Sequence, residues 1–291
     1  MTLINRTVLM SDARNFRVDS PINPYYGAPT ADAELAEREH QSIKAAFREA
    51  SVEVITTSSP VESQDGVYTA NWALVRGDVV ILARLPEVRK AEEAHAEKVL
   101  RELGKEIVYA PEGLKFSGQG DALPCGEYLF CGRGYRSDEA AQVFAAETLG
   151  YTRIQLETIP QRDIHGNAVV NTTSGWADSF FYDIDLALSI LRAPTAERKG
   201  LIAYCPEAFT EESQRIIEGF DAVEKIIMTL TEAQESFAAN LVSTGETVIM
   251  SATAPLLRQA IIDAGLAVIT PEVKELAKGG GYIRCTALTL D

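Results

Sequence analysis

Short apolar runs alternate with longer amphipathic segments along the whole chain. Runs with a period of two predict β-strands, and apolar residues that recur every three or four positions predict helices. We predict strands at residues 8–10, 52–56, 72–75, 78–83, 107–109, 127–131, 154–157, 180–188, 201–204, 226–228, 247–250 and 266–269. We predict helices at about residues 31–50, 89–103, 137–149, 211–220 and 254–264, the third with Ser137 as its N-cap.

The order of these elements predicts one continuous α/β domain over residues 1–291. No linker rich in proline, glycine or serine interrupts the alternation. A strand-strand-helix-strand rhythm recurs about every 50–60 residues, which indicates pseudo-repeated modules around a centre.

Composition narrows the class of protein. Apolar residues make up 46% of the chain and charged residues 24%, as in globular proteins. No apolar run approaches the roughly 18–20 residues of a membrane span, and the N-terminus lacks the apolar core of a signal peptide. The four cysteines show no CxxC spacing, so we expect neither a zinc site nor a disulfide framework, and the cytoplasm is the expected location.

The net charge of −15 argues against nucleic acid or an anionic membrane as the main partner. Acidic side chains also occur where strands are expected to be buried. On the strand predicted at residues 180–188, Asp183 and Asp185 would share one face, opposite Tyr182 and Ile184. Two unpaired carboxylates on an apolar strand are costly, so this pattern predicts a cationic partner or a functional cleft. An exposed acidic edge strand is the alternative.

The chain ends on a glycine run followed by a cysteine. Gly279-Gly280-Gly281 precede a short β-like segment that contains Cys285. Glycines before a strand permit a turn at positive φ and the close approach of another group. Cys285 is therefore either held at the mouth of a pocket or an inert thiol in a buried edge strand.

Taken in order, several segments resemble the guanidino-group-modifying superfamily, the pentein fold. Residues 11–18 with Ile22-Asn23-Pro24 resemble its opening, and residues 65–71 resemble its PDxxFxxN/D segment. Residues 116–121 stand where the family has EGGD, and residues 132–137 resemble its arginine-bearing turn. Residues 181–185 stand where the family has FYHLD, and the terminal glycines with Cys285 match its nucleophile segment.

This resemblance implies a five-bladed α/β propeller with a pocket on its axis. It implies that Cys285 attacks a guanidinium carbon and forms a covalent thiouronium, and that Asp121 and Asp185 bind the cation. The same resemblance places Asp65, Asn71, Ser117 and Asn23 in the substrate-binding wall. Arg136, with Arg84 and Arg89 as alternatives, would hold a substrate carboxylate. Neither a metal nor an organic cofactor is implied.

The sequence departs from the family at one functional pair. Asp183 occupies the place of the general acid/base histidine, and Ser117 occupies the place of its glutamate partner. His40 and His95 lie in charged helices and are expected on the surface, whereas His165 lies in a polar loop that would have to fold over the pocket. Asp183 could itself serve as acid/base if burial and nearby carboxylates raise its pKa.

Three classes of function therefore stay open. The first is an enzyme acting on an arginine-like guanidino or amidino compound, by hydrolysis of the dimethylargininase, deiminase or dihydrolase type or by amidino transfer. The second is a catalytically silent protein that binds arginine or a similar cation. The third is a structural or interaction protein. The sequence does not identify the substrate or decide whether the chain forms a homo-oligomer.

Overall fold

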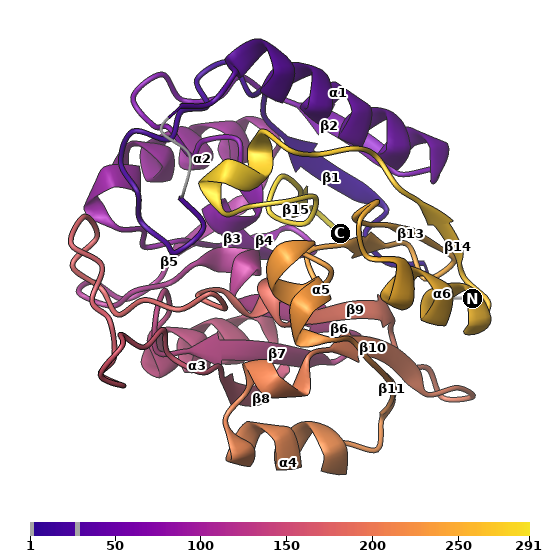
Figure 1. The fold of residues 1–291 in the computed structure, drawn as a ribbon. Helices are drawn as coiled ribbons and strands as arrows, with labels where there is room; N and C mark the ends of the chain where they lie inside the picture. Colours follow the sequence, from indigo (N-terminus) through magenta and orange to yellow (C-terminus); the bar gives the residue numbers. More distant parts are fainter. Residues whose placement is uncertain (1–2, 27–29) are drawn as a thin grey trace.

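The computed structural model describes residues 3–26 and 30–291 and contains five small sheets of three strands each (Figure 1). In each sheet the middle strand pairs antiparallel with one neighbour and parallel with the other. The middle strands are β1 (Thr7–Met10), β4 (Val79–Leu82), β7 (Tyr128–Arg133), β10 (Gly200–Tyr204) and β13 (Thr247–Ile249). Their parallel partners are β2 (Glu53–Thr56), β5 (Glu106–Tyr109), β8 (Thr152–Glu157), β11 (Val223–Ile227) and β14 (Ala267–Ile269). Their antiparallel partners are β15 (Leu288–Thr289), β3 (Ala73–Arg76), β6 (Ala122–Cys125), β9 (Leu188–Arg192) and β12 (Val242–Ser243).

A helix connects each middle strand to its parallel partner, as a parallel pair requires. These helices are α1 (Ala33–Glu49), α2 (Lys90–Glu102), α3 (Glu139–Leu149), α4 (Glu211–Gly219) and α6 (Pro255–Asp263), and the short α5 (Leu230–Glu235) follows β11. The longest, α1, begins where the Asp32 carboxylate accepts a hydrogen bond from Leu35 N at 2.9 Å. It buries Ile43 and Phe47 in the core. No helix in residues 3–26 or 30–291 has the length and apolarity that crossing a membrane demands.

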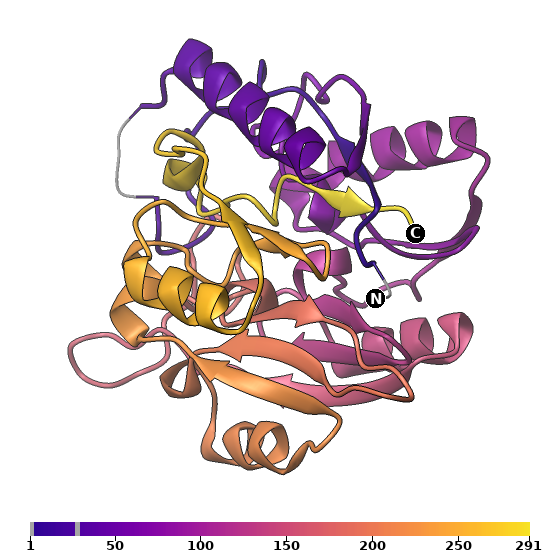
Figure 2. The ribbon, with the colours of Figure 1, turned by 90° about the vertical axis from the view of Figure 1, so that its right-hand side faces the viewer.

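The two ends of the chain complete the same blade. The C-terminal strand β15 pairs antiparallel with the N-terminal β1, and Figure 2 shows it beside that strand. The Asp291 carboxylate accepts hydrogen bonds from the backbone N–H groups of Arg6 and Thr7. The five sheets thus form a five-bladed α/β propeller, which confirms the predicted pseudo-repeated modules.

Each antiparallel strand is preceded by a short turn or 3₁₀ segment, and these segments contain several of the candidate site residues. The helical ones are η1 (Thr69–Trp72) before β3, η3 (Gly118–Gly120) before β6 and η4 (Ile184–Leu186) before β9. Asn71, Asp121, Asp185, Asn240 and Cys285 all lie within three residues of the start of such a strand. One repeated position in the module therefore supplies polar side chains to a common region.

Some predicted elements are wrong. Residues 180–188 form turns and η4 rather than a strand, and β9 begins only at Leu188. The N-cap of α3 is Asp138, whereas the Ser137 hydroxyl accepts a hydrogen bond from Ser117 N at 3.1 Å. Three short elements were not predicted. Strand β6 contains a proline, strand β12 has only two residues, and helix α5 is too short to show a clear apolar period.

His40 is not on the surface as predicted. It is fully buried on α1, and neither ring nitrogen has a hydrogen-bond partner among the described residues. Burial, followed by the positive charge of nearby Lys44, lowers the pKa of His40 from 6.5 to about 3. His95 is half-buried and contacts Ser58 O at 2.9 Å.

We expect His40 to make the protein sensitive to mild acid. Below pH 6.5 the unfolded chain protonates this histidine while the folded chain does not, so stability falls as pH falls toward the folded pKa of about 3. The expected loss between pH 6.5 and 5 is about 2 kcal/mol. Urea unfolding should show this loss in the wild type and a smaller one in His40→Leu. His165→Leu, at an exposed histidine, is the control and should behave as the wild type. Equal acid sensitivity in His40→Leu would contradict the assignment.

Candidate active site

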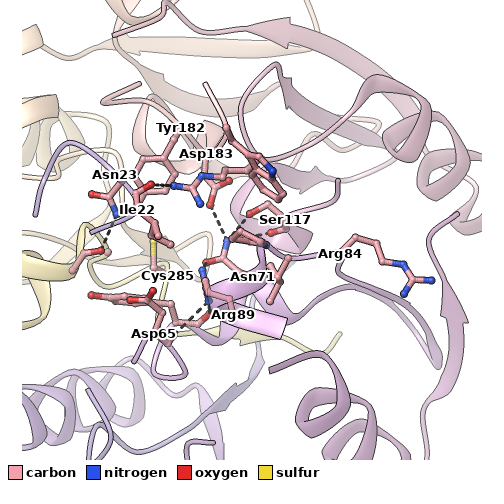
Figure 3. A pocket seen from close by; sticks show the side chains of 17 residues that line it. Ile22, Asn23, Asp65, Asn71, Arg84, Arg89, Ser117, Tyr182, Asp183 and Cys285 are labelled. Carbon is pink, nitrogen blue, oxygen red and sulfur yellow. Dashed lines mark hydrogen bonds between the residues drawn. The ribbon is translucent and has the colours of Figure 1, made fainter. Parts of the chain in front are cut away.

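A narrow cavity brings together all the predicted site residues except Asp121 and Asp185 (Figure 3). Its volume of about 20 Å³ is enough for about one water molecule. It is lined by Ile22, Asn23, Asp65, Tyr68, Asn71, Arg84, Leu85, Pro86, Arg89, Ser117, Arg136, Trp176, Tyr182, Asp183, Gly279, Gly281 and Cys285.

Cys285 lies in the turn before β15, with only 2% of its surface exposed. Asn240 holds it from two sides: its amide nitrogen donates to Sγ at 3.1 Å, and its carbonyl oxygen accepts from Cys285 N at 3.1 Å. The thiol lies 3.5 Å from Asp185 Oδ2, within reach of proton transfer to that carboxylate. Burial, followed by the charge of Asp185, raises the pKa of Cys285 well above its usual range. The resting group is therefore a neutral thiol.

The glycine run before Cys285 passes through a space too narrow for side chains. Gly280 has φ +83°, and a Cβ there would collide with Asn23. A Cβ on Gly281 would collide with the ring of Tyr68. Asn23 Nδ2 donates to Gly279 O at 3.0 Å, and Tyr182 OH donates to Gly280 O at 2.6 Å. The predicted close approach is thus present, and it fixes the chain that leads to the thiol.

A hydrogen-bond network orients Asp183 on the opposite wall. Asn71 Nδ2 donates to Asp183 Oδ2 at 2.8 Å and to Ser117 Oγ at 2.9 Å. Arg89 Nη1 donates to Asn71 Oδ1 at 2.9 Å and so sets the direction of that amide. Arg89 in turn is paired with the buried carboxylate of Glu92 at 2.7 Å. Among the described residues, Asp183 Oδ1 has no hydrogen-bond partner.

Asp183 and Asp185 do not share one face, contrary to the prediction. Asp183 lines the cavity together with Tyr182, whereas Asp185 in η4 lies on the lining of a second cavity. Asp121 lines neither cavity, and its Oδ1 accepts from Ile184 N at 3.0 Å. The alternation expected of a strand fails because the 3₁₀ turn rotates successive side chains by about a third of a turn.

The three carboxyl groups form a buried acidic cluster. Burial raises the pKa of Asp121, Asp183 and Asp185, for the first and last well above the usual range. The charge of Asp183 adds to the increase for Asp121 and Asp185, while Arg136 opposes it for Asp183. The cluster therefore retains protons until a cation arrives to stabilise the charged forms.

The remaining predicted side chains differ in how free they are to bind a ligand. Asp65 Oδ1 accepts from Tyr26 OH at 2.7 Å, and Asn23 is held by the glycine run. The Arg136 guanidinium lies 4.9 Å from the ring centroid of Tyr182 and 5.9 Å from that of Trp176, and it donates to Ile22 O. Arg84 donates to Ala110 O, and Figure 3 shows its guanidinium directed away from the other labelled side chains.

A long connection after β8 contributes to the cavity through Trp176 rather than through His165. This connection forms a hairpin with isolated bridges at Arg162 with Ala168 and at Val170 with Ala177. His165 is exposed on this hairpin and is absent from the cavity lining. Trp176 belongs to the cavity lining, and its ring lies beside the Arg136 guanidinium.

Comparisons with known proteins agree with this geometry. No family model matches the chain. It is 29% identical over 286 residues to a bifunctional arginine dihydrolase/ornithine cyclodeaminase of Nostoc, covering 96% of this chain and 37% of that protein. It is 27% identical to an N(G),N(G)-dimethylarginine dimethylaminohydrolase of Mycobacterium tuberculosis, covering 98% of this chain and 86% of that one. The solved N-terminal domain of a cyanobacterial arginine dihydrolase, a cysteine-to-serine variant bound to substrate, superposes with a TM-score of 0.83 at 26% identity and covers 97% of both chains.

The chain has the pentein fold, and guanidino-modifying hydrolases are its homologues. A second solved variant of that arginine dihydrolase domain is covalently bound to a reaction intermediate and superposes with a TM-score of 0.84. The chain spans about 37% of the length of the bifunctional relatives it matches. The fold predicted from the ordered motifs is confirmed.

Sequence reasoning missed Asn240, the residue that holds the thiol of this pentein. A signal exists, because Ala239-Asn240 precedes β12 just as Ala70-Asn71 precedes β3. Only the repeated module, once its register is known, makes these two positions equivalent.

We expect Asn240→Ala to alter the reactivity of Cys285. Its amide donates to Sγ and so favours the thiolate; without it the pKa of the thiol rises further. The pH profile of Cys285 alkylation by iodoacetamide should therefore shift to higher pH. Asn167→Ala, in the exposed hairpin, is the control and should leave the profile unchanged. An unshifted profile in Asn240→Ala would show that Asn240 does not tune the thiol.

Proposed function

We propose that this pentein hydrolyses a guanidino compound of the arginine class through a covalent bond to Cys285. The observation that carries the proposal is the Cys285 thiol, held by Asn240 and 3.5 Å from Asp185, beside a cavity whose walls carry Asp65 and Asp183. A guanidinium is planar and permanently charged, and buried carboxylates are the groups that bind it best. The names of the relatives support the same chemistry.

The first half of the proposed reaction forms a carbon–sulfur bond. Asp185 accepts the thiol proton, and Sγ attacks the guanidinium carbon to give a neutral tetrahedral adduct. The protonated carboxyl of Asp183 then donates a proton to one amino group, which leaves as the free amine when its C–N bond breaks. A thiouronium cation stays attached to Cys285. Burial raises the pKa of Asp183 and so favours its protonated form. Burial raises the pKa of Asp185 as well, and Asp185 becomes the base because the guanidinium cation beside it favours the ionised carboxylate.

In the second half, water attacks the same carbon and passes a proton to the carboxylate of Asp183. The C–S bond breaks and the thiolate recovers its proton from Asp185. The hydroxyl proton of the adduct passes to solvent, and the carbon leaves as a neutral ureido group. Asp183 thus fills the acid and base role that the family's histidine fills.

Substrate entry requires side chains to move, because the cavity of about 20 Å³ is too small for an amino acid. The Trp176 ring lies beside Arg136, and Arg136 lies over Tyr182. We propose that the hairpin bearing Trp176 opens and that Arg136, released from Ile22 O, binds the substrate carboxylate.

A second candidate function is a silent binder of arginine-like cations. The specific observation in its favour is the neutral, buried thiol together with Asp183 and Ser117 in the places of the usual histidine and glutamate. Such a protein would keep the cation site without turnover. Amidino transfer, in which the substrate's amine leaves and another amine attacks the intermediate, uses the same Cys285 chemistry.

Incubation with arginine, agmatine, monomethylarginine and dimethylarginine tests these proposals. A hydrolase should release ammonia, methylamine or dimethylamine together with citrulline, ornithine or carbamoylputrescine. No product, combined with a raised melting temperature for one of these compounds, would support the silent binder. Neither product nor thermal shift would contradict both functions.

The double substitution Asp183→His with Ser117→Glu separates the two further. In a silent binder it should create hydrolase activity. In an active enzyme that depends on Asp183, the change should move the pH optimum of existing activity toward that of a histidine.

A further inference from the structure

A second and larger cavity lies behind the thiol. Its volume is about 260 Å³, just below the ~300–1,000 Å³ typical of small-molecule pockets. It shares no lining residue with the first cavity. Residues close in sequence line different cavities. Cys285 and Asp183 line the first cavity, whereas Arg284 and Asp185 line the second.

An acidic and a basic side chain, Asp185 and Arg284, both line this cavity. Asp185 and Arg284 are 1% and 6% exposed. The charge of Arg284 partly opposes the effect of burial on the pKa of Asp185, but no ion pair within 4.0 Å joins the two in the part of the chain that the structure describes. Asp185 Oδ1 also has no hydrogen-bond partner among those residues. A buried carboxyl oxygen without a partner is costly, and because Asp185 lines the second cavity this oxygen points to a missing ligand group there.

Arg284 has donors to spare. Nη1 donates to Ala287 O at 3.2 Å and to Thr289 Oγ1 at 3.1 Å, and Nη2 donates to Gln119 Oε1 at 2.9 Å. A guanidinium has five N–H donors, so Nε and one Nη2 hydrogen have no partner within residues 3–26 and 30–291. Gln119 is itself fixed, because its amide nitrogen donates to Thr289 O at 2.9 Å. The guanidinium is thus held rigidly with its remaining donors able to bind a carboxylate.

Much of the remaining lining is apolar, although Asn5, Ser189 and Thr289 also belong to it. Its apolar side chains include Leu123, Leu188, Ile190 and Leu241, all buried. The other charged lining groups are already engaged: Arg76 donates to Leu149 O and Gly150 O, and Asp291 accepts from Arg6 and Thr7. The lining therefore offers an apolar channel and one pair of opposite charges, but no further charge for a polar tail.

We propose that this second cavity binds a free α-amino acid with an apolar side chain. Its ammonium group would bind Asp185 and its carboxylate would bind Arg284, and its side chain would lie along the leucines and Ile190. An amine alone would leave Arg284 without an anion, and a carboxylic acid alone would place its charge beside Asp185. The proposal does not require turnover at Cys285, although Asp185 also lies 3.5 Å from that thiol.

Isothermal titration with L-leucine, isoamylamine and 4-methylpentanoate tests the head group. L-leucine should bind with one site per chain, and the amine and the acid at least tenfold more weakly. Binding should persist in Cys285→Ser, because the first cavity is separate. No leucine binding, or equal binding of the amine or the acid, would overturn the proposal whatever the outcome of the activity assays.

A larger side chain that fills the second cavity tests whether leucine binds there. Ile190→Phe on β9 should abolish leucine binding, whereas Ile227→Phe, on the exposed face of β11 in the same sheet, should leave it unchanged. If Ile190→Phe shows no cooperative unfolding, Leu123→Phe from the facing wall replaces it. Unchanged leucine binding in a folded cavity-filling variant would place the ligand elsewhere and overturn the proposal.

Discussion

Cys285→Ser is expected to abolish turnover of guanidino compounds, lowering kcat by roughly 10⁴-fold or more, as loss of a covalent nucleophile does in other enzymes. Serine is nearly isosteric and keeps the two hydrogen bonds with Asn240, so the cavity and its affinity for substrate should survive. A hydroxyl is a much weaker nucleophile at neutral pH than a thiol, and the proposed acid and base cannot compensate for that. The measurement is steady-state amine release together with the substrate dissociation constant.

The matched control is Cys205→Ser. Cys205 is also fully buried but lies away from both cavities, after β10. It should retain the activity of the wild type. Substantial turnover in Cys285→Ser, or equal losses in both variants, would remove Cys285 from the centre of the mechanism.

Glu92→Leu is expected to lower the free energy of unfolding by about 3–5 kcal/mol, because it leaves the buried charge of Arg89 without a partner. The Glu92 carboxylate accepts from Arg89 Nε at 2.8 Å, from Arg89 Nη2 at 2.7 Å and from Trp72 Nε1 at 3.0 Å. Ser63 Oγ donates to it as well. Both charged side chains are buried, at 7% and 0% exposure, so water cannot replace the lost acceptor.

Urea unfolding measures this loss of stability, and two further variants serve as comparisons. Glu97→Gln breaks an exposed ion pair with Arg101 on the same helix and should cost much less. Arg89→Met combined with Glu92→Leu removes both charges and should recover part of the stability. The same double variant should still lose activity, because Arg89 orients Asn71. A Glu92→Leu chain as stable as Glu97→Gln would contradict the account of this pair.

The sequence predicted most of the fold, because amphipathic helices and buried strands follow simple periods. All five helices that connect parallel strands were predicted to within about two residues of their ends. The strand predicted around Asp183 was wrong, because an apolar run of that kind is also compatible with a buried 3₁₀ turn. The spacing of apolar residues alone does not distinguish a strand from such a turn. The consequence was large, because the turn sends Asp183 and Asp185 to different cavities.

The site was predicted from ordered motifs rather than from periodicity. Cys285, Asn71 and Asp183 meet at one cavity, as expected. Asn240 was missed because its partner is 45 residues away along the chain and nothing local marks it. Burial of His40 was missed as well, since its charged neighbours in sequence point outward while its own face packs inward. Contacts between distant segments decide such positions, and one sequence does not display them.

The central claim is that Cys285 becomes covalently attached to a guanidinium carbon. Intact-protein mass spectrometry after rapid acid quench of the protein with L-arginine tests it most directly. The account predicts an adduct of arginine less ammonia, located on the peptide that contains Cys285 and absent from Cys285→Ser. An adduct of the amidino group alone would indicate transfer chemistry instead of this hydrolysis. Arginine turnover with no adduct on Cys285 at any quench time, or an adduct on another residue, would contradict the account.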